Sequence, residues 1–439
     1  MQPLHHPVFR WLFTAQVLSL LGVGTMTVAL ALQAFALGGL DYAGKILGGI
    51  FALKMVVYVG LAPLAEVLLS RYSTRHVLIA LDLVRLCLLF MLSFATQVWH
   101  LVGLTFIFYM ASAAFTPLYQ ATIPSVLTDE KTYTAALVLS RLAYTFESML
   151  SPVVAAIALS LVAPASLFPI AALFMTGSVL ALYVSGLSAS TESSKKRPFK
   201  ERLSRGLVIY FRTPRLRGLF VLNLALSFGL GWVLVNTVVY TGLHFEGSSV
   251  HYTYLMGAFG AGAALAALSV PRWLALTNER NVIFAGCVLF SVLSTLIVIE
   301  LPVYLLMLLW SGFGAASSLV LTPGGLVLTR SATKADHPAV FAAQFSMSHA
   351  GWLLAYPVAG LLGASIDPAV ALVILGGVCF LIALVGWKMW PAHDPQQRTH
   401  SHPELQSDHP HLRNHLNEAQ SHEHSHVFYI DDLHLKWDK

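Results

Sequence analysis

Residues 62–85 read APLAEVLLSRYSTRHVLIALDLVR, a short charged break between two long apolar runs. The chain alternates in this way along most of its length: 56% of its residues are hydrophobic and only 11% are charged. Soluble domains usually carry about a quarter charged residues, so this composition excludes an ordinary water-soluble fold. A helix needs about 20 apolar residues to cross a bilayer. The sequence therefore predicts a polytopic membrane protein.

Twelve such runs are predicted between Trp11 and Trp390, and a basic segment divides them six and six. The predicted spans are 11–36, 43–69, 77–96, 98–122, 135–162, 166–187, 217–242, 251–274, 281–300, 302–325, 338–363 and 368–390. The expected domains are an N-terminal six-helix half (1–187), a basic cytoplasmic linker (188–216), a C-terminal six-helix half (217–390) and a histidine-rich cytoplasmic tail (391–439).

The two halves share a weak internal repeat. A shift of 208 positions lays Pro63 over Pro271, and a shift of 205 lays Pro152 over Pro357. Both shifts pair one span with the span six places later. This is the parallel repeat expected of two six-helix halves that rock about a central cavity.

Lysine and arginine gather on one side of the predicted membrane, with the densest cluster at Lys195–Arg217. The positive-inside rule then places both termini in the cytoplasm, and we expect a multi-pass protein of the bacterial inner membrane. This bias accounts for the net charge of +5, so no nucleic-acid partner is expected. Anionic lipid headgroups are the expected contact of the basic linker.

Residues 62–85 resemble the characteristic loop of the major facilitator superfamily. Arg71 and Arg75 match its basic positions, whereas Ser70 stands where the acidic residue is usual. Asp82 and Arg85, three residues apart, could supply the missing charge partner of this gating loop. The resemblance implies an all-α membrane protein with twelve transmembrane helices in two six-helix halves.

Four further stretches resemble the nickel-resistance exporters of that superfamily, a branch with histidine-rich cytoplasmic tails. They are YTAALVLSRLAYTFESMLSP (133–152), VNTVVY (235–240), HPAVFAAQFSMSHAGWLLAYPVAG (337–360) and HSHVFYIDDLH (424–434). The resemblance implies secondary active export of a divalent transition metal, nickel or alternatively cobalt, by proton antiport. The alternative is an exporter of drugs, siderophores or other organic solutes with an incidental or regulatory tail.

The tail concentrates ten of the eighteen histidines within residues 391–439. Neutral imidazole suits Ni²⁺, Cu²⁺, Zn²⁺ and Co²⁺, so these side chains are candidate metal ligands. The predicted tail ligands are His400, His402, His409, His411, His415, His422, His424 and His426. A solvated polar tail that happens to be rich in histidine is the alternative. The apolar residues Phe428, Ile430, Leu433 and Trp437 near the end are expected to dock on the cytoplasmic face or to lie on the membrane surface.

Ionisable residues inside predicted spans are costly and so point to function. Lys54 lies near the middle of the second span, and Glu147 lies near the middle of the fifth. Ser140, Tyr144 and Glu147 follow helical spacing down one face, which should line the cavity, whereas Arg141 lies off that face. We expect Glu147, with Lys54, Arg141 and Tyr144, to couple protons to transport. A structural ion pair of Glu147 with Lys54 or Arg141 is the alternative.

His349 in the eleventh span occupies the depth that Tyr144 occupies in the fifth, and the two spans are repeat mates. His349 and Gln344 are therefore candidate metal contacts within the membrane, although such a histidine can simply hydrogen-bond a neighbouring helix. No nucleotide-binding loop or catalytic constellation appears, so neither an enzyme nor a cofactor other than the metal is expected. The oligomeric state is left open.

Overall fold

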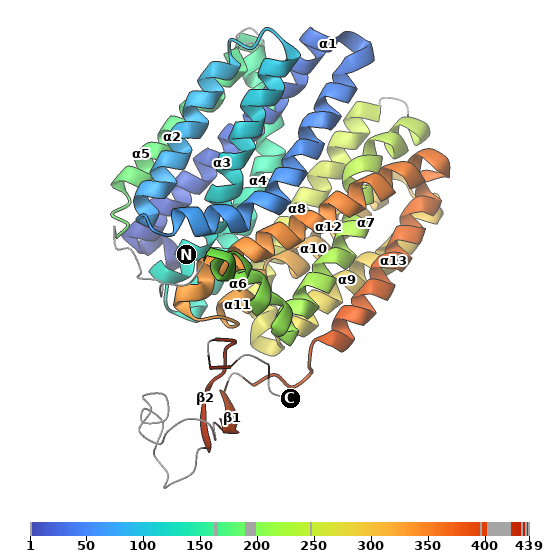
Figure 1. Ribbon diagram of the computed structural model, residues 1–439. Coiled ribbons are helices and arrows are strands. Elements are labelled where there is room, and N and C mark those ends of the chain that lie inside the picture. Colours follow the sequence, from blue (N-terminus) through green and yellow to red (C-terminus); the bar gives the residue numbers. More distant parts are fainter. Residues whose placement is uncertain are drawn as a thin grey trace.

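The computed structural model describes residues 2–161, 166–188, 199–245, 248–395, 397–401, 423–431, 433–434 and 437. Long helices form a bundle, and a small pair of strands projects from the end where both termini lie (Figure 1). The prediction of an all-α membrane protein is confirmed. The long helices are α1 (Pro7–Leu69), α2 (Thr74–Leu92), α3 (Val98–Val126), α4 (Glu130–Leu161), α5 (Leu167–Val184), α7 (Pro214–His244), α8 (Ser248–Leu276), α9 (Glu279–Ser294), α10 (Val303–Leu321), α12 (His337–Ser365) and α13 (Pro368–Met389).

Nine helical segments among the described residues are long and apolar enough to cross a membrane. Two of them, Pro7–Gly38 and Ile46–Leu69, belong to α1, and the ribbon bends between them (Figure 1). The long helices α2, α4 and α12 fall outside these nine. They carry charged and polar residues, among them the buried Asp82 of α2 and the half-buried Glu147 of α4 and His349 of α12.

The helices form two groups, with α1 to α5 on one side and α7 to α13 on the other (Figure 1). Within the second group, α8 packs tightly on α10, because a Cβ atom at Gly314 would lie only 1.9 Å from the carbonyl oxygen of Phe259. Small residues permit this approach in a bilayer, where helices associate through packing. The two groups meet where α1 packs on α12 and where α4 packs on α8.

A short helix, α6 (Phe199–Arg212), joins the two groups and packs on α12 and α1. Two shorter helical turns, α11 (Gly324–Thr329) and η4 (Lys334–Asp336), connect α10 to α12. Arg205 of α6 binds Asp336 with two nitrogens, at 3.2 and 3.0 Å. This ion pair fixes the joining helix to the start of α12.

The tail folds back on the second group. Strand β1 (Gln397–Ser401) pairs antiparallel with β2 (Glu423–Val427), and His400 stands opposite His424 in the register. Phe428 and Ile430 follow directly, are each 1% exposed, and belong to the same apolar core as Trp390. Of the two expectations for the terminal apolar residues, docking on the protein is what the structure shows. Leu433 is the exception and is 38% exposed.

Candidate substrate cavity and the docked tail

A polar cavity of about 530 Å³ lies between the two groups of helices. Its walls come from both groups, with α1, α3 and α4 on one side and α7, α11 and α12 on the other. All six residues predicted for coupling and for intramembrane metal contact line it, namely Lys54, Arg141, Tyr144, Glu147, Gln344 and His349. Their roles stay predictions, but the structure brings them to one place.

Lys54 lies beside two neighbouring tyrosine rings. Its Nζ is 5.5 Å from the ring centroid of Tyr58 and 5.6 Å from that of Tyr109, within the range of a cation–π contact. In the described part of the chain no ion pair within 4 Å joins Lys54 to Glu147, although the two charges lie close enough to attract each other. Sequence reasoning missed both tyrosines. Tyr58 stands four residues after Lys54, a spacing that could have found it.

Glu147 and its helix face behave as the spacing predicts. Ser140, Tyr144 and Glu147 of α4 all line the cavity, and the Ser140 hydroxyl donates to Gln16 at 3.1 Å. Glu147 also borders a separate apolar pocket of about 320 Å³ between the start of the chain and α4, where Phe13 and Phe146 lie. The carboxylate therefore stands at the wall between a polar and an apolar space.

Arg141 spans the two groups. Its Nη2 donates to Ser317 at 3.0 Å and its Nε donates to Ser318 at 3.2 Å, both on α10. Although it lies off the face that holds Glu147, its long side chain still reaches the cavity. Within the described residues it has no carboxylate partner within 4 Å.

His349 faces the first group through aromatic contacts. Its ring centroid lies 4.8 Å from that of Tyr58, and its Nδ1 lies 2.7 Å from the carbonyl oxygen of Phe345, one turn earlier on its own helix. The hydrogen bond recorded for this histidine is thus within α12 and not with a neighbouring helix. Donation from Nδ1 would leave Nε2 as the metal-binding nitrogen. Gln344, one turn away from Ser348, hydrogen-bonds the hydroxyl of Tyr210.

No ready-made metal site appears in the part of the chain that the structure describes. Nowhere do three histidine, cysteine or carboxylate side chains gather closely enough to hold an ion. Glu147 and His349 line one cavity without forming such a group. The cavity therefore offers scattered donors instead of a closed coordination shell.

Two of the predicted gating residues, Asp82 and Arg85, form a buried ion pair, and the other two, Arg71 and Arg75, lie nearer the surface. Arg85 pairs with Asp82, both side chains are almost fully buried, and the second carboxylate oxygen of Asp82 accepts from Ser178 at 2.7 Å. Arg75 donates to the carbonyl oxygen of Tyr183 at 2.7 Å, and Arg71 is exposed. Asp82 and Arg85 are thus partners, as the spacing suggested.

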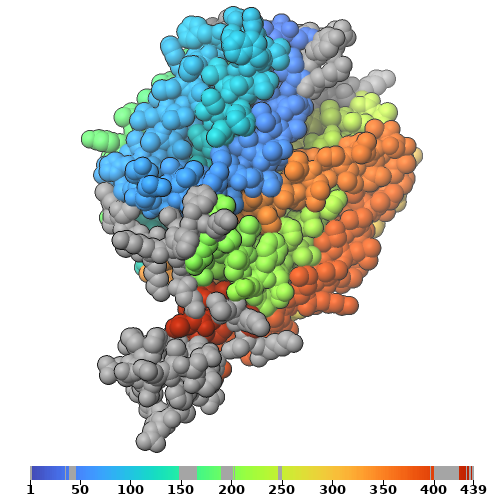
Figure 2. Space-filling view, viewed as in Figure 1, coloured from blue at the N-terminus to red at the C-terminus, as the bar shows by residue number. Residues whose placement is uncertain are grey.

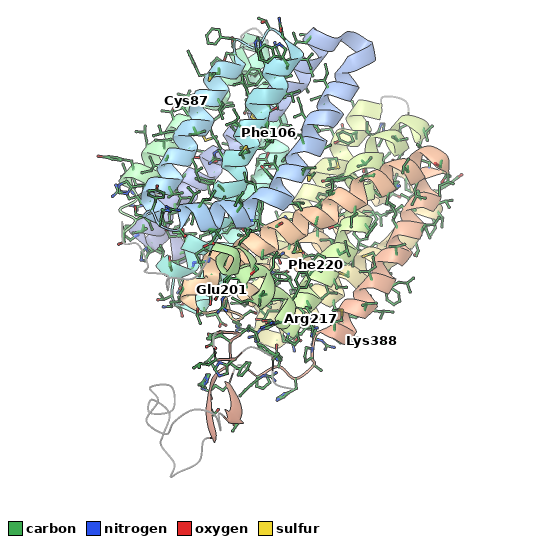
Figure 3. All side chains as sticks on the ribbon, viewed as in Figure 1. Cys87, Phe106, Glu201, Arg217, Phe220 and Lys388 are labelled. Atoms are coloured by element: carbon green, nitrogen blue, oxygen red, sulfur yellow. The ribbon has the colours of Figure 1, made fainter. Side chains whose placement is uncertain are left out.

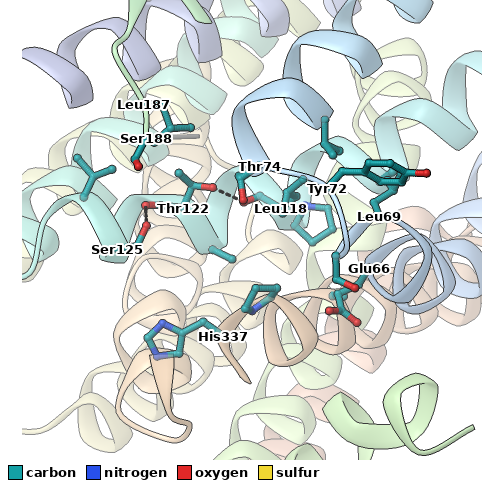
Figure 4. Close-up of a pocket in the computed structure, with 18 of the residues that line it drawn as sticks. Glu66, Leu69, Tyr72, Thr74, Leu118, Thr122, Ser125, Leu187, Ser188 and His337 are labelled. Carbon is teal, nitrogen blue, oxygen red and sulfur yellow. Dashed lines mark hydrogen bonds between the residues drawn. The ribbon is translucent and has the colours of Figure 1, made fainter. Parts of the chain in front are cut away.

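A second pocket of about 440 Å³ lies nearer the end of the bundle where the termini are. Figure 4 shows Glu66 of α1 and His337 of α12 on different sides of it. The Nε2 of His337 lies 3.2 Å from the carbonyl oxygen of Ala332. The pocket is lined by residues of both groups of helices.

The end of the tail is held by arginines. The Trp437 ring makes cation–π contacts with two guanidinium groups, those of Arg215 at 5.1 Å and Arg398 at 4.9 Å from its centroid. Asp394 joins both arginines, at 3.4 and 3.2 Å. Figure 3 places Arg217 and Lys388 at this same end of the bundle. The docking surface is therefore basic as well as apolar.

Few of the predicted tail ligands can be located. His402, His409, His411, His415 and His422 lie outside the described residues. His400 and His424 are partners across the strand pair, and the His426 ring packs 5.2 Å from that of His434. Figure 2 shows the described part of the tail against the lower face of the bundle. Metal binding by the tail stays a prediction.

Two solved structures share this architecture. The human organic anion transporter MFSD10 (TETRAN) matches with a TM-score of 0.70 and 15% sequence identity, over 87% of this chain and 99% of that one. FucP, a major facilitator superfamily transporter in the outward conformation, matches with a TM-score of 0.66 and 12% identity, over 87% and 99% of the two chains. At these identities the likeness establishes the fold. The sequence matches no curated protein.

The paired helical groups around a polar cavity define a membrane transporter of the major facilitator superfamily, and not an enzyme. Residues 1–333 match the family described as transmembrane secretion effector. Because this match covers more than half of the chain, the chain belongs to that family. The predicted superfamily and the twelve-helix fold class are thereby confirmed.

Proposed function

We propose that this transporter exports a divalent transition metal, nickel or alternatively cobalt, from the cytoplasm in exchange for protons, and so confers metal resistance. The observation that carries the metal is the tail, where ten of eighteen histidines fall within residues 391–439. Imidazole is a common ligand of these ions. With both termini in the cytoplasm of a bacterial inner membrane, the tail would collect ions at the inward mouth.

Two cavity residues suit the exchange. Glu147 and His349 come from α4 and α12, helices of different groups, and both line the central cavity. A carboxylate that binds a cation when ionised and releases it when protonated would couple the two ions. Neutral imidazole binds metal and protonated imidazole does not, so protonation would act on both residues in the same direction.

Growth of expressing cells across a panel of metals, together with intracellular metal content, tests the proposal. Resistance to nickel or cobalt with a lowered content of that metal is expected. Unchanged growth and content for every metal, with the protein present in the membrane, would refute it.

Export of organic solutes is the second candidate function. It is favoured by the cavity itself, which is large for a bare ion and whose described lining holds the cations Lys54 and Arg141 against the single carboxylate Glu147. The structurally similar MFSD10 is an organic anion transporter, which agrees with a cationic cavity. Drug resistance, or release of siderophores, in cells that show no metal phenotype would favour this candidate.

A further inference from the structure

The charges that line the central cavity do not suit a bare dication. Lys54, Arg85 and Arg141 line it together with a single described carboxylate, Glu147. Asp82 neutralises Arg85, which leaves two cations and one anion. A divalent ion would enter a space whose described lining carries a net positive charge, and like charges repel strongly where water is scarce.

Coordination leads to the same difficulty. A hydrated transition metal gives up its waters only for several nitrogen or oxygen ligands in a defined geometry. Of the histidine, cysteine and carboxylate side chains that commonly hold transition metals, the described lining offers Glu147 and His349, and these do not form a group that could hold an ion. The other donors of the lining, such as Gln344 and Tyr144, are neutral. A bare ion would therefore find no preformed shell of such charged or imidazole ligands among the described residues.

A plain organic anion does not suit all of these groups either. Its carboxylates would complement Lys54 and Arg141, but Glu147 would repel them and His349 would have no metal to bind. The cations and the metal donors are interspersed. Lys54 and His349 both contact Tyr58, and Arg141 lies six residues before Glu147 on α4.

We propose that the cavity binds the metal as a complex with a small carboxylate ligand. The ligand supplies most of the coordination shell, its outer carboxylate oxygens contact Lys54 and Arg141, and Glu147 and His349 complete the metal's coordination. Arginine is suited to carboxylates because its planar fork makes two parallel hydrogen bonds. A cavity of about 530 Å³ is in the range that holds small molecules.

This inference rests on the proposed function, and transport assays separate the two. Proteoliposomes that contain the full chain are assayed under three conditions: radioactive nickel in a weakly coordinating buffer, radioactive nickel with labelled citrate, and labelled citrate alone. Free Ni²⁺ activity is held equal in the first two. The rate is expected to follow the concentration of the nickel–citrate complex, with labelled citrate crossing alongside the metal.

Three other outcomes overturn the inference. A rate that follows free Ni²⁺ and is indifferent to citrate would leave metal export intact but reject the complex. A nickel complex with ethylenediamine, which is cationic, crossing as fast as the citrate complex would reject the role of the carboxylates. No transport of nickel, nor of cobalt under the same conditions, would reject the proposed function as well, and citrate transport alone would then identify an organic anion carrier.

Variants test the two cations. Lys54→Gln is expected to raise the KM for the citrate complex about tenfold or more, because a charge-assisted contact is lost, with a smaller effect on kcat. Arg141→Gln should act likewise, and Arg141→Lys should restore only part of the affinity. Lys388→Gln, an exposed lysine outside the cavity, is the control for overall charge and should leave the KM unchanged. An unchanged KM in Lys54→Gln and Arg141→Gln alike would remove the proposed carboxylate contacts.

Discussion

Arg330 and Glu130 form an ion pair that joins the two groups of helices. The Nε of Arg330 lies 3.2 Å from one carboxylate oxygen of Glu130, and a second guanidinium nitrogen contacts the other oxygen. Arg330 also pairs with Glu279 of its own group. Because Glu130 begins α4 and Arg330 follows α11, the pair tethers the groups near the end of the bundle where the termini lie.

Removing this tether should ease the opening of that end. Glu130 is 55% exposed, so the pair contributes at most about 1 kcal/mol, and Glu130→Gln should raise the open population up to about fivefold. The measurement is the rate of thiol labelling at Thr122→Cys, a buried position that lines the pocket nearer the termini, after Cys87, Cys287 and Cys379 are replaced. The exposed residue Glu300 supplies the control Glu300→Gln, and equal labelling rates in both variants would show that the pair does not hold this end closed.

Glu147→Gln should abolish coupling. The amide keeps the size and hydrogen-bonding capacity of the side chain but cannot take up a proton, so metal uptake driven by a pH gradient in inverted vesicles should fall to near background. Ser140→Ala, on the same face of α4, should retain most of the activity. Wild-type transport with the same pH dependence in Glu147→Gln would make the carboxylate structural, and Glu66 or Asp82 would be tested next.

His349→Ala should weaken apparent metal affinity more than it alters proton coupling. The side chain offers one metal-binding nitrogen, and loss of a single ligand should raise the KM for metal about tenfold or more. Uptake is measured against metal concentration at several pH values. His349→Gln, which keeps a polar side chain, should be nearly as impaired, whereas full affinity in both variants would exclude this histidine as a ligand.

Replacing the tail histidines should lower resistance without abolishing it. The structure argues against truncation after Pro391 as the test, because truncation also removes Phe428 and Ile430 from the core. Serine in place of His402, His409, His411, His415 and His422 leaves that core intact. Fewer Ni²⁺ ions bound by calorimetry and an intermediate growth phenotype are expected, whereas a complete loss of resistance would place the essential site in the tail.

Acid should release the docked tail only at low pH. Burial opposes the ionisation of Asp431, but hydrogen bonds from the side chain and backbone of His434 outweigh it and lower the pKa of the carboxyl. Its stabilising effect is therefore complete above the usual pKa of about 3.9 and is lost only as the pH falls through the lowered value. Tail release is measured as the rate of limited proteolysis of the tail. Asp431 should contribute no change in this rate between pH 5 and 8, and Asp431→Asn should weaken docking throughout that range.

The apolar runs predicted the fold well because a helix that crosses a bilayer needs a length and composition that a sequence displays directly. Helical spacing likewise placed Ser140, Tyr144 and Glu147 on one cavity wall. Contacts across the two groups were not predictable in this way. The Arg330–Glu130 pair joins residues 200 positions apart, and the cation–π contact of Lys54 with Tyr109 depends on how α1 packs on α3.

The docked tail has a consequence for the order of folding. Phe428 and Ile430 complete a core that otherwise consists largely of residues from α6 to α13, so the second group of helices is inserted before all of its core exists. Domains fold largely from the N-terminus during synthesis, and the last strand is made after every membrane span. The second group can therefore reach its final packing only after Phe428 and Ile430 have been synthesised and have left the ribosome.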